Sequence, residues 1–367
     1  MRVGAFILAA QFPGQGQGEA LHRAVRSAQL SEEAGLDAVW LAEHHFVPYG
    51  VCPSAVTLAA LLLGRTRRIG VGTAVSVLPT AHPVALGEQA ALLHLVSGGR
   101  FTLGVGRGGP WVDLEVFGTG LRAYERDFPE SLDLLLRWLR EPRVGADGER
   151  FTFREVPVVP RPDEALPDAA LTDEALTDEA LADEALADEA RGGGPPVIVA
   201  CTSPGTVRLA AERGLPMMLG MHCGDDEKAE AVGLWRESAL AAGRSPEEVA
   251  AVAEEHVSAG VVQIADARPV AAETLVKAMP GWLRQGLDAH VTVDGRPRRM
   301  RDPLAYAELL CGLHPVGPPR LCADRLAATA ERTGIRRFAL LVEGSGELAA
   351  TEENVRRLGA EVLPLLH

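Results

Sequence analysis

Two adjacent histidines, His44 and His45, end an apolar segment that is predicted to form a buried strand. Side chains alternate between the two faces of a strand, so His44 shares a face with Trp40 and Ala42. If that face points inward, His44 reaches a cleft at the strand end, where an imidazole with an ordinary pKa of about 6.5 suits proton transfer at neutral pH. A structural histidine and a zinc ligand are the alternatives. No third His or acidic residue stands nearby at metal-ligand spacing.

The segment Ser203–Thr206, with the sequence Ser-Pro-Gly-Thr, follows another apolar run and has the residue types that begin a helix. The free N–H groups and positive dipole of a helix start also favour anions, and Gly205 permits a close approach. Arg107 lies in the glycine-rich segment Gly104–Gly109 after a further strand, and its guanidinium suits bidentate binding of a phosphate. The alternatives are a plain helix cap and an arginine paired with a carboxylate.

Eight short apolar segments alternate with longer segments of helical spacing, and these elements must position the residues above. Strand followed by helix, eight times over, predicts a parallel sheet closed into a (β/α)8 TIM barrel, an α/β fold. A doubly wound open sheet is the alternative, but no G-x-G-x-x-G follows the first strand. In a barrel the working residues lie at the carboxyl ends of the strands. The expected strands are Val3–Ala9, Ala38–His44, Ile69–Val77, Phe101–Gly106, Val197–Cys201, Met217–Gly220, Val257–Ile264 and Phe338–Val342. The expected helices are Glu19–Ala34, Ser54–Gly64, Pro83–Val96, Asp127–Leu139, Ser203–Arg213, Glu227–Ala242, Pro319–Thr333 and Thr351–Leu365.

We expect residues 1–367 to form a single barrel. Two stretches interrupt its alternation of strands and helices. Residues 163–190 repeat a five-residue acidic unit. A Leu every five residues advances by about 500° around a helix axis, so these leucines share no face. We expect a solvated, helix-prone or disordered insertion there. Residues 266–303 are expected to be irregular and follow the seventh strand, which makes them a candidate active-site lid.

A basic run stands at the end of the second stretch. We expect these arginines either to clamp an anionic substrate or to form a solvated loop balanced by Asp294 and Asp302. The arginines are Arg296, Arg298, Arg299 and Arg301.

Charge and cysteine content exclude several classes of protein. The net charge of the 367-residue chain is −14, and eleven of the negative charges fall in residues 163–190, so the nearly neutral remainder offers no field for nucleic acid. The five cysteines include no C-x-x-C pair, which predicts a reduced, cytoplasmic protein. The apolar residues Val3–Ala10 are interpreted as a first strand rather than a signal peptide. No apolar run approaches the roughly 20 residues that span a bilayer.

The order of several motifs resembles the bacterial luciferase-like flavin monooxygenases, in particular the luciferase α subunit. The resemblance covers almost the whole chain except the acidic repeat and much of the candidate lid. The motifs that carry it are Ser31–Phe46, which includes Glu43-His44-His45, then Val71–Val75, Leu78–Val84, Gly98–Phe101, Val116–Thr119, Arg213–Met217, Pro315–Gly317 and Thr333–Ile335.

The family resemblance implies a (β/α)8 barrel, usually dimeric, that takes reduced FMN from a separate NAD(P)H:flavin reductase. It implies reaction of FMNH2 with O2 to a flavin C4a-hydroperoxide, which oxygenates a small-molecule substrate. By position, it makes His44 the catalytic histidine and Ala74-Val75 the pair that forms a non-proline cis peptide beneath the isoalloxazine. The phosphate ligands that it implies are Arg107, Arg126, Ser203 and Thr206.

Two departures from the luciferase α subunit fall in the implied flavin pocket. This chain has Gly106 where that subunit has a reactive cysteine, and Thr202 where it has a glutamate. The resemblance therefore implies an oxygenation reaction, but it does not extend to light emission or to the use of long-chain aldehydes. An F420-dependent oxidoreductase on the same barrel and a non-catalytic partner subunit, like the luciferase β chain, are the functional alternatives. Retention of His44 and Arg107 argues against the partner subunit.

Overall fold

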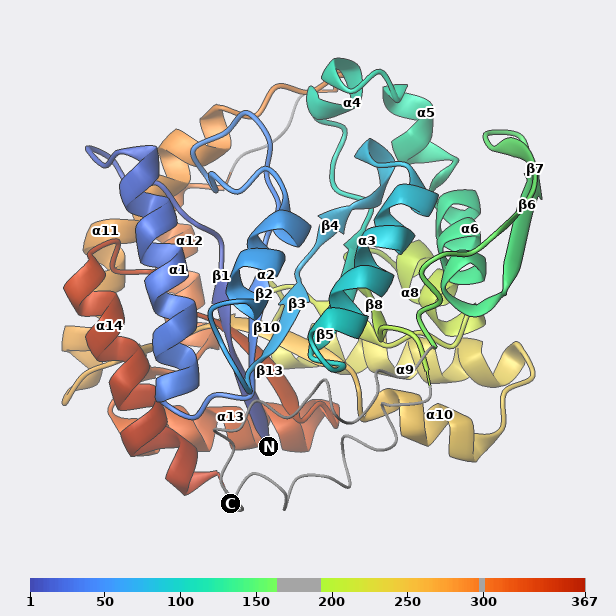
Figure 1. The fold of residues 1–367 in the computed structure, drawn as a ribbon. Coiled ribbons are helices and arrows are strands. Elements are labelled where there is room, and N and C mark those ends of the chain that lie inside the picture. The colour runs from blue at the N-terminus through green and yellow to red at the C-terminus, as the bar shows by residue number, and fades with distance from the viewer. Residues whose placement is uncertain (164–192, 297–300, 367) are drawn as a thin grey trace, which may run out of the picture.

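Parallel strands at the centre of the chain close into a barrel. The computed structural model describes residues 1–163, 193–296 and 301–366 (Figure 1). Within them the pairing order is β3-β2-β1-β13-β10-β9-β8-β5, and pairing of β3 with β5 closes the ring. The predicted (β/α)8 fold is confirmed, and the open sheet is wrong. The barrel strands are β1 (Arg2–Ile7), β2 (Ala38–Leu41), β3 (Gly70–Thr73), β5 (Phe101–Gly106), β8 (Val197–Cys201), β9 (Met217–Leu219), β10 (Val257–Val261) and β13 (Arg337–Leu341); the short β4 (Ser76–Val77) also pairs with β5.

Helices surround the barrel, as Figure 1 shows. Each predicted helix is present, with ends that differ by a few residues except at the carboxyl end of the chain, where the last helix ends at Arg357 and short turns follow. The helices are α1 (Gln17–Glu33), α2 (Ala55–Leu63), α3 (Pro83–Val96), α6 (Phe128–Arg140), α8 (Pro204–Glu212), α9 (Asp225–Ala241), α13 (Pro319–Thr333) and α14 (Leu348–Arg357).

Two buried clusters form the core. One lies between the strands and the surrounding helices, and the other fills the barrel interior and includes Trp40 and Ala42. The face that carries Trp40 and Ala42 therefore points inward, which is the condition under which His44 was expected to reach the cleft. The Trp40 ring fits inside because a Cβ on Gly72 would lie only 2.5 Å from its Cε3 atom, so a larger residue at 72 would displace the indole.

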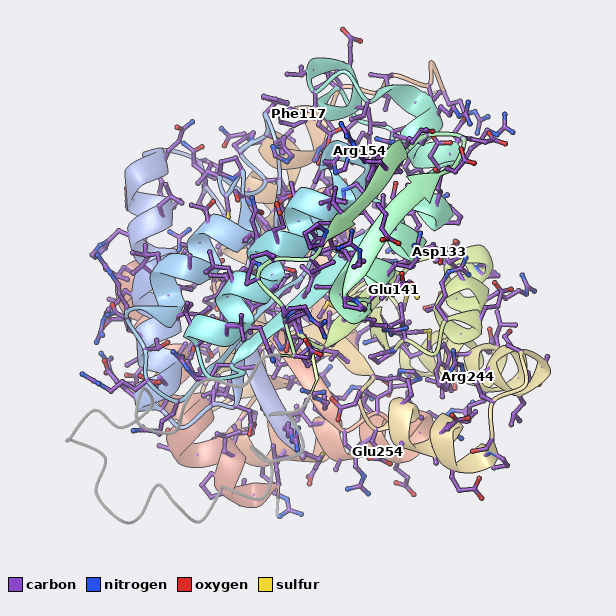
Figure 2. The ribbon with its side chains drawn as sticks, turned by 45° about the vertical axis from the view of Figure 1, so that its right-hand side comes forward. Phe117, Asp133, Glu141, Arg154, Arg244 and Glu254 are labelled. Atoms are coloured by element: carbon purple, nitrogen blue, oxygen red, sulfur yellow. The ribbon has the colours of Figure 1, made fainter. Side chains whose placement is uncertain are left out.

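The sequence patterns did not predict several elements outside the barrel. A hairpin of β6 (Arg143–Asp147) and β7 (Thr152–Pro157) lies beside α6 in Figure 2 and packs on its Leu134 and Trp138 through Val144 and Phe151. The others are the helices α4 (Asp113–Val116), α5 (Gly120–Glu125), α10 (Pro246–Ala253) and α12 (Pro303–Leu313), and the strand β12 (Val316–Gly317). Strand β12 pairs with β11 (Gln263–Ile264), which is the end of the predicted strand Val257–Ile264.

The expectation that residues 266–303 are irregular is wrong for most of the stretch. Residues Arg268–Asp288 form the 21-residue helix α11, with Pro280 inside it. An interior proline normally disfavours a helix, but burial of one face against the barrel interior overrides this preference. The buried face consists of Ala271, Leu275, Met279, Trp282, Leu283 and Gly286.

Two predictions concern residues that the structure does not describe. The acidic repeat lies outside the described residues apart from Asp163, as do Arg298 and Arg299 of the basic run. Among the helices that are described, none has the length and apolar character needed to cross a bilayer.

Candidate active site

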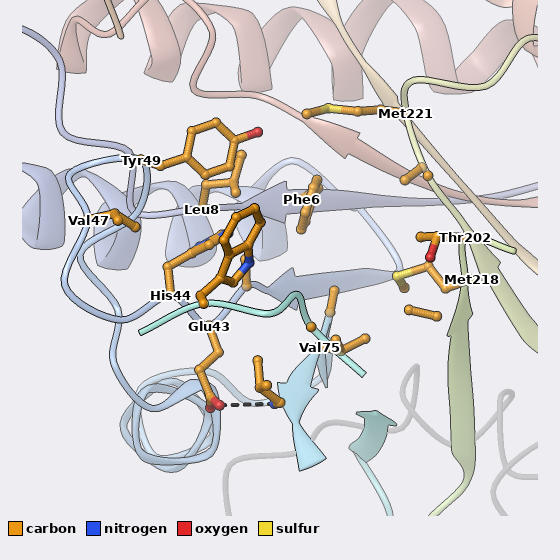
Figure 3. A pocket seen from close by; sticks show the side chains of 18 of the residues that line it. Phe6, Leu8, Glu43, His44, Val47, Tyr49, Val75, Thr202, Met218 and Met221 are labelled. Carbon is orange, nitrogen blue, oxygen red and sulfur yellow. Dashed lines mark hydrogen bonds between the residues drawn. The ribbon is translucent and has the colours of Figure 1, made fainter. Parts of the chain in front are cut away.

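A cavity of about 340 Å³ opens at the carboxyl ends of the barrel strands (Figure 3). Its walls are mainly apolar. They come from residues within β1, β8, β9 and β10 and from the segments that follow β1, β2, β3, β5, β8 and β9. This is the end of the barrel at which the sequence predicted the chemistry. The lining residues include Phe6, Leu8, His44, Tyr49, Ala74, Val75, Trp111, Thr202, Met218, Met221, His222 and His290.

His44 lines this cavity. The predicted strand Ala38–His44 ends earlier, at Leu41, so His44 lies just beyond β2 rather than within it. Its ring meets the edge of Tyr49, with 5.0 Å between centroids and an interplanar angle of 84°. Its Nδ1 is buried without a hydrogen-bond partner among the described residues, which leaves Nε2 as the nitrogen available to a ligand. Burial lowers the pKa of His44 to about 3, with smaller contributions from His290 and His45. The imidazole is therefore neutral at pH 7, and the expected pKa near the ordinary value is wrong for this site.

The residues on either side of His44 hold its loop in place. The Glu43 carboxylate accepts the N–H groups of Ala55 at 3.1 Å, at the start of α2, and of Val77 at 3.0 Å, in β4. The second of these bonds is drawn in Figure 3. His45 has Nε2 3.6 Å from Glu43 Oε1, and its ring meets Phe117 edge-on at 5.0 Å. Glu43 thus ties the His44 loop to two neighbouring elements.

Ala74 and Val75 line the cavity after β3. The peptide bond between them is cis, as the family resemblance implied. Gly106 lies behind Val75, because a Cβ on Gly106 would stand 2.4 Å from Val75 Cγ2. Val75 therefore occupies the space that a side chain at position 106 would need.

The structure brings Arg107 and Ser203 to neighbouring strand ends. Arg107 directly follows β5, Ser203 follows β8, and these strands pair with Val105 opposite Val199. The Arg107 guanidinium stacks over the Tyr124 ring at 4.4 Å from its centroid. No carboxylate pairs with Arg107 among the residues that the structure describes, so the paired alternative is not seen there.

Ser203 and Thr206 cap α8 reciprocally. Ser203 Oγ accepts the N–H of Thr206 at 3.3 Å, and Thr206 Oγ1 accepts the N–H of Ser203 at 3.2 Å. The predicted helix start is confirmed. Thr202, one residue earlier, lines the cavity. Arg126 is exposed at the end of α5, two residues beyond Tyr124, and the described residues give it no ion pair.

The sequence analysis missed several cavity residues, among them Tyr49, Trp111 and His290. The segment after α11 carries His290, whose Nδ1 is 2.9 Å from the Gly286 carbonyl and whose ring is 4.7 Å from that of Trp111. Backbone bonds join this segment to the loop after β5, from Val112 N to Val291 O and from Val293 N to Pro110 O. The spacing of Tyr49, Trp111 and His290 in the sequence does not indicate a shared site, because the contacts that bring them together join distant parts of the chain.

Within the described part of the chain, no group of three or more His, Cys, Asp or Glu side chains is arranged to hold a metal ion.

Comparisons with known proteins identify the family of this chain. Residues 1–337 match the family model described as luciferase-like monooxygenase. The alkanal monooxygenase alpha chain of the Kryptophanaron alfredi symbiont is 28% identical over 383 residues, which cover 100% of this chain and 98% of that one. The homologous chain of Photorhabdus luminescens is also 28% identical with the same coverage.

Solved structures of low identity share the fold. Monooxygenase RslO1 from Streptomyces bottropensis has a TM-score of 0.77 at 21% identity and covers 99% of both chains. The oxygenating constituent of 3,6-diketocamphane monooxygenase from Pseudomonas putida, solved with FMN, has a TM-score of 0.73 at 21% identity, covering 100% of this chain and 99% of that one. An F420-dependent secondary alcohol dehydrogenase has a TM-score of 0.71 at 16% identity and the same coverage. With a family match over residues 1–337, this chain belongs to the luciferase-like monooxygenases and is a flavin-dependent enzyme of that family.

Proposed function

We propose that this chain is the oxygenating component of a two-component system. It takes reduced FMN from a separate, transiently bound NAD(P)H:flavin reductase and uses O2 to oxygenate a small organic substrate. The observation that carries the proposal is the position of Arg107 and the Ser203–Thr206 cap at neighbouring strand ends, beside the cavity that contains His44.

The strand ends suit the phosphate of FMN. The Arg107 guanidinium stacks on the Tyr124 ring and is not paired with a carboxylate among the described residues, so it can bind a phosphate. Ser203 and Thr206 add two hydroxyl groups at the N-terminal end of α8, where backbone N–H groups and the helix dipole favour an anion. Arg126 adds a second unpaired cation on the segment of Tyr124. These four residues would hold the phosphate.

The cavity suits the flavin ring. Ala74, Val75 and Thr202 line it, and Gly106 leaves Val75 free to fill the space behind. These residues would hold the ring, and the apolar walls would exclude water from it. Bound FMNH2 would supply the electrons with which O2 is reduced as one oxygen atom is transferred to the substrate.

His44 would move the proton of the reaction. Its low pKa keeps the imidazole neutral at pH 7. In a neutral ring one nitrogen carries a proton and the other can accept one, so the ring would be able to take or return a proton beside the cavity. Glu43 holds the backbone of this loop and so keeps the imidazole beside the cavity.

The test begins with binding of FMN to the purified chain. We expect both oxidised and reduced FMN to bind, and Arg107→Ala to weaken binding roughly tenfold to a hundredfold, as expected for loss of charge-assisted hydrogen bonds. Protein loaded with FMNH2 is then mixed with O2, and reoxidation and H2O2 release are followed. Slower reoxidation than that of free FMNH2, with delayed H2O2 release, supports the proposal. Absence of FMN binding, together with binding of reduced F420, would replace it with the F420-dependent alternative.

We further propose a cytoplasmic homodimer that binds a small molecule and no nucleic acid. All five cysteines are free thiols, which suits a reducing compartment. Exposed apolar side chains on neighbouring helices supply a surface for self-association: Leu61 on α2, and Leu92 and Val96 on α3.

A further inference from the structure

The Tyr49 side chain is held rigidly at the cavity wall, and neither flavin binding nor the proton transfer proposed for His44 involves it. Its ring stacks on Trp282 with 4.8 Å between centroids and 6° between planes, and it meets the edge of His44. Trp282 Nε1 donates to the Tyr49 carbonyl oxygen at 3.0 Å. A Cβ on Gly286 would lie 2.8 Å from Tyr49 Cβ, so the backbone of α11 approaches the tyrosine closely. The ring has little room to turn.

The Tyr49 hydroxyl is directed into the cavity, as Figure 3 shows. The hydroxyl has no hydrogen-bond partner among the described residues. It is also not one of the fully buried polar atoms that lack a partner, so its oxygen is accessible to a ligand. Burial of the ring raises the pKa of Tyr49, which keeps the phenol protonated at neutral pH. The site therefore presents a fixed, neutral hydrogen-bond donor.

The surroundings of this donor are mainly apolar or aromatic. Leu8 and Met221 line the cavity, and the rings of Trp111 and His290 lie 4.7 Å apart in its wall. Aromatic walls favour ring contacts. The two carboxylates of the lining, Glu43 and Asp113, already accept backbone N–H groups. Among the described lining residues there is no lysine or arginine, so an anionic ligand would find no cation to pair with. An apolar ligand without an acceptor would leave the phenol unpaired.

We infer that Tyr49 is a positioning residue that selects an uncharged, ring-containing substrate by donating a hydrogen bond to an oxygen acceptor on it. This inference rests on the proposed oxygenase function. The rigid ring places the substrate oxygen at one point of the wall and the body of the substrate beside His44 Nε2. No bond is made or broken by Tyr49, and the phenol keeps its proton.

The experiment compares two probes of similar shape, acetophenone and ethylbenzene, of which only the first has a strong oxygen acceptor. Binding to the full chain, with and without oxidised FMN, is measured by calorimetry for the wild type and for Tyr49→Phe, which keeps the stacked ring. We expect the wild type to prefer acetophenone roughly three- to tenfold, the value of one neutral hydrogen bond. Tyr49→Phe should lose this preference while its affinity for ethylbenzene is unchanged.

A matched control removes another phenol nearby. Tyr306 lines a neighbouring cavity that shares His222 with this one, and Tyr306→Phe should keep the wild-type preference. The carbonyl stretch of bound acetophenone should lie at lower frequency in the wild type than in Tyr49→Phe, a difference that altered packing alone would not produce.

Three results would overturn the inference: a preference that survives in Tyr49→Phe, an equal loss of affinity for both probes, or no binding of either probe by the wild type. None of the measurements requires turnover. Failure of FMN to bind would count against the proposed function, whereas failure of the probe comparison counts against the role of Tyr49.

Discussion

At the scale of single residues, the His44 imidazole is the chemically distinctive group of the cavity. Burial and the neighbouring His290 and His45 all disfavour its charged form, so its pKa falls to about 3. The imidazole is therefore neutral at pH 7, with one ring nitrogen that carries a proton and one that can accept a proton.

Replacement of His44 by alanine should separate binding from turnover. We expect His44→Ala to bind FMN as the wild type does but to lose roughly 10²- to 10⁴-fold in turnover, the usual contribution of a general acid–base residue. The measurements are FMN titration and the rate of substrate oxygenation. His22→Ala, at an exposed position on α1, is the control and should match the wild type. Normal turnover by His44→Ala would remove His44 from the mechanism.

Gly106 and Val75 should behave as a coupled pair. A methyl group at 106 would collide with Val75 Cγ2, so Gly106→Ala should destabilise the fold by about 1–3 kcal/mol, the usual cost of overpacking, and weaken FMN binding. Val75→Ala removes the colliding methyl group, and the double variant should recover much of both losses. The check is a double-mutant cycle of denaturant unfolding and FMN affinity. Strict additivity would mean that the two side chains do not compete for this space.

At the scale of elements, helix starts and strand ends position the candidate site. Helix α8 begins at a Ser-Pro capping box, and α10 begins at another, in which Ser245 Oγ accepts the N–H of Glu248. The two caps have the same chemistry, but only the first lies at a strand end beside the cavity.

This pair of caps provides a matched test of anion binding. Ser203→Ala and Ser245→Ala should each lower the free energy of unfolding by about 1 kcal/mol, the usual value of an N-cap. Only Ser203→Ala should also weaken FMN binding, because only that cap lies near Arg107. Unfolding curves and FMN titrations measure the two effects. Equal FMN affinities for the two variants would exclude the α8 start from the phosphate site.

Helix α11 shows how packing decides an element that local sequence disfavours. Its interior Pro280 and Gly281 are typical helix breakers, yet one face is buried from Ala271 to Gly286. The segment after it pairs with the loop after β5 and brings His290 to the cavity. The main described part of the expected lid, residues 266–303, is therefore a helix rather than a loop.

At the scale of the whole molecule, association should depend on the exposed apolar side chains of α2 and α3. We expect the wild type to be a dimer and Leu92→Glu to be a monomer, because a charge would be buried unpaired in the interface. Sedimentation velocity at micromolar concentration measures the state. Leu240→Glu, which changes a comparably exposed leucine on α9, should remain dimeric. A monomeric wild type, or equal dissociation of both variants, would contradict the proposal.

The stability of the fold should fall in acid because of buried histidines. Burial lowers the pKa of His256 to about 3, and its Nδ1 accepts the N–H of Met217 at 3.0 Å. Between pH about 6.5 and about 3 the unfolded chain binds a proton at His256 that the folded chain does not, so the free energy of unfolding decreases as the pH falls. The contribution of one histidine approaches about 1.4 kcal/mol per pH unit.

The variant His256→Asn tests this contribution. Asparagine keeps an acceptor for the Met217 N–H but does not titrate. The free energy of unfolding, measured with denaturant across this pH range, should therefore depend less steeply on pH than in the wild type. Parallel pH profiles for the two proteins would show that His256 does not couple folding to protons.

The sequence by itself determined the barrel, its helices and the end of the barrel at which chemistry is placed. Alternation along a strand and capping residues at a helix start are encoded within a few neighbouring positions. Trp40, Ala42 and His44 could therefore be placed on one face of a strand, and His44, Arg107 and Ser203 at strand ends, before any contact was known. The alternation alone leaves open which face of that strand points into the barrel.

Only the tertiary structure decided the environment of these residues. The low pKa of His44 arises from desolvation, and desolvation depends on side chains such as Tyr49 and His290 that the fold brings around it. Trp282 lies 233 positions from Tyr49 in the chain, yet it fixes the orientation of that ring. Local patterns contain no record of such partners, because packing and burial are properties of segments that meet only after the chain has folded.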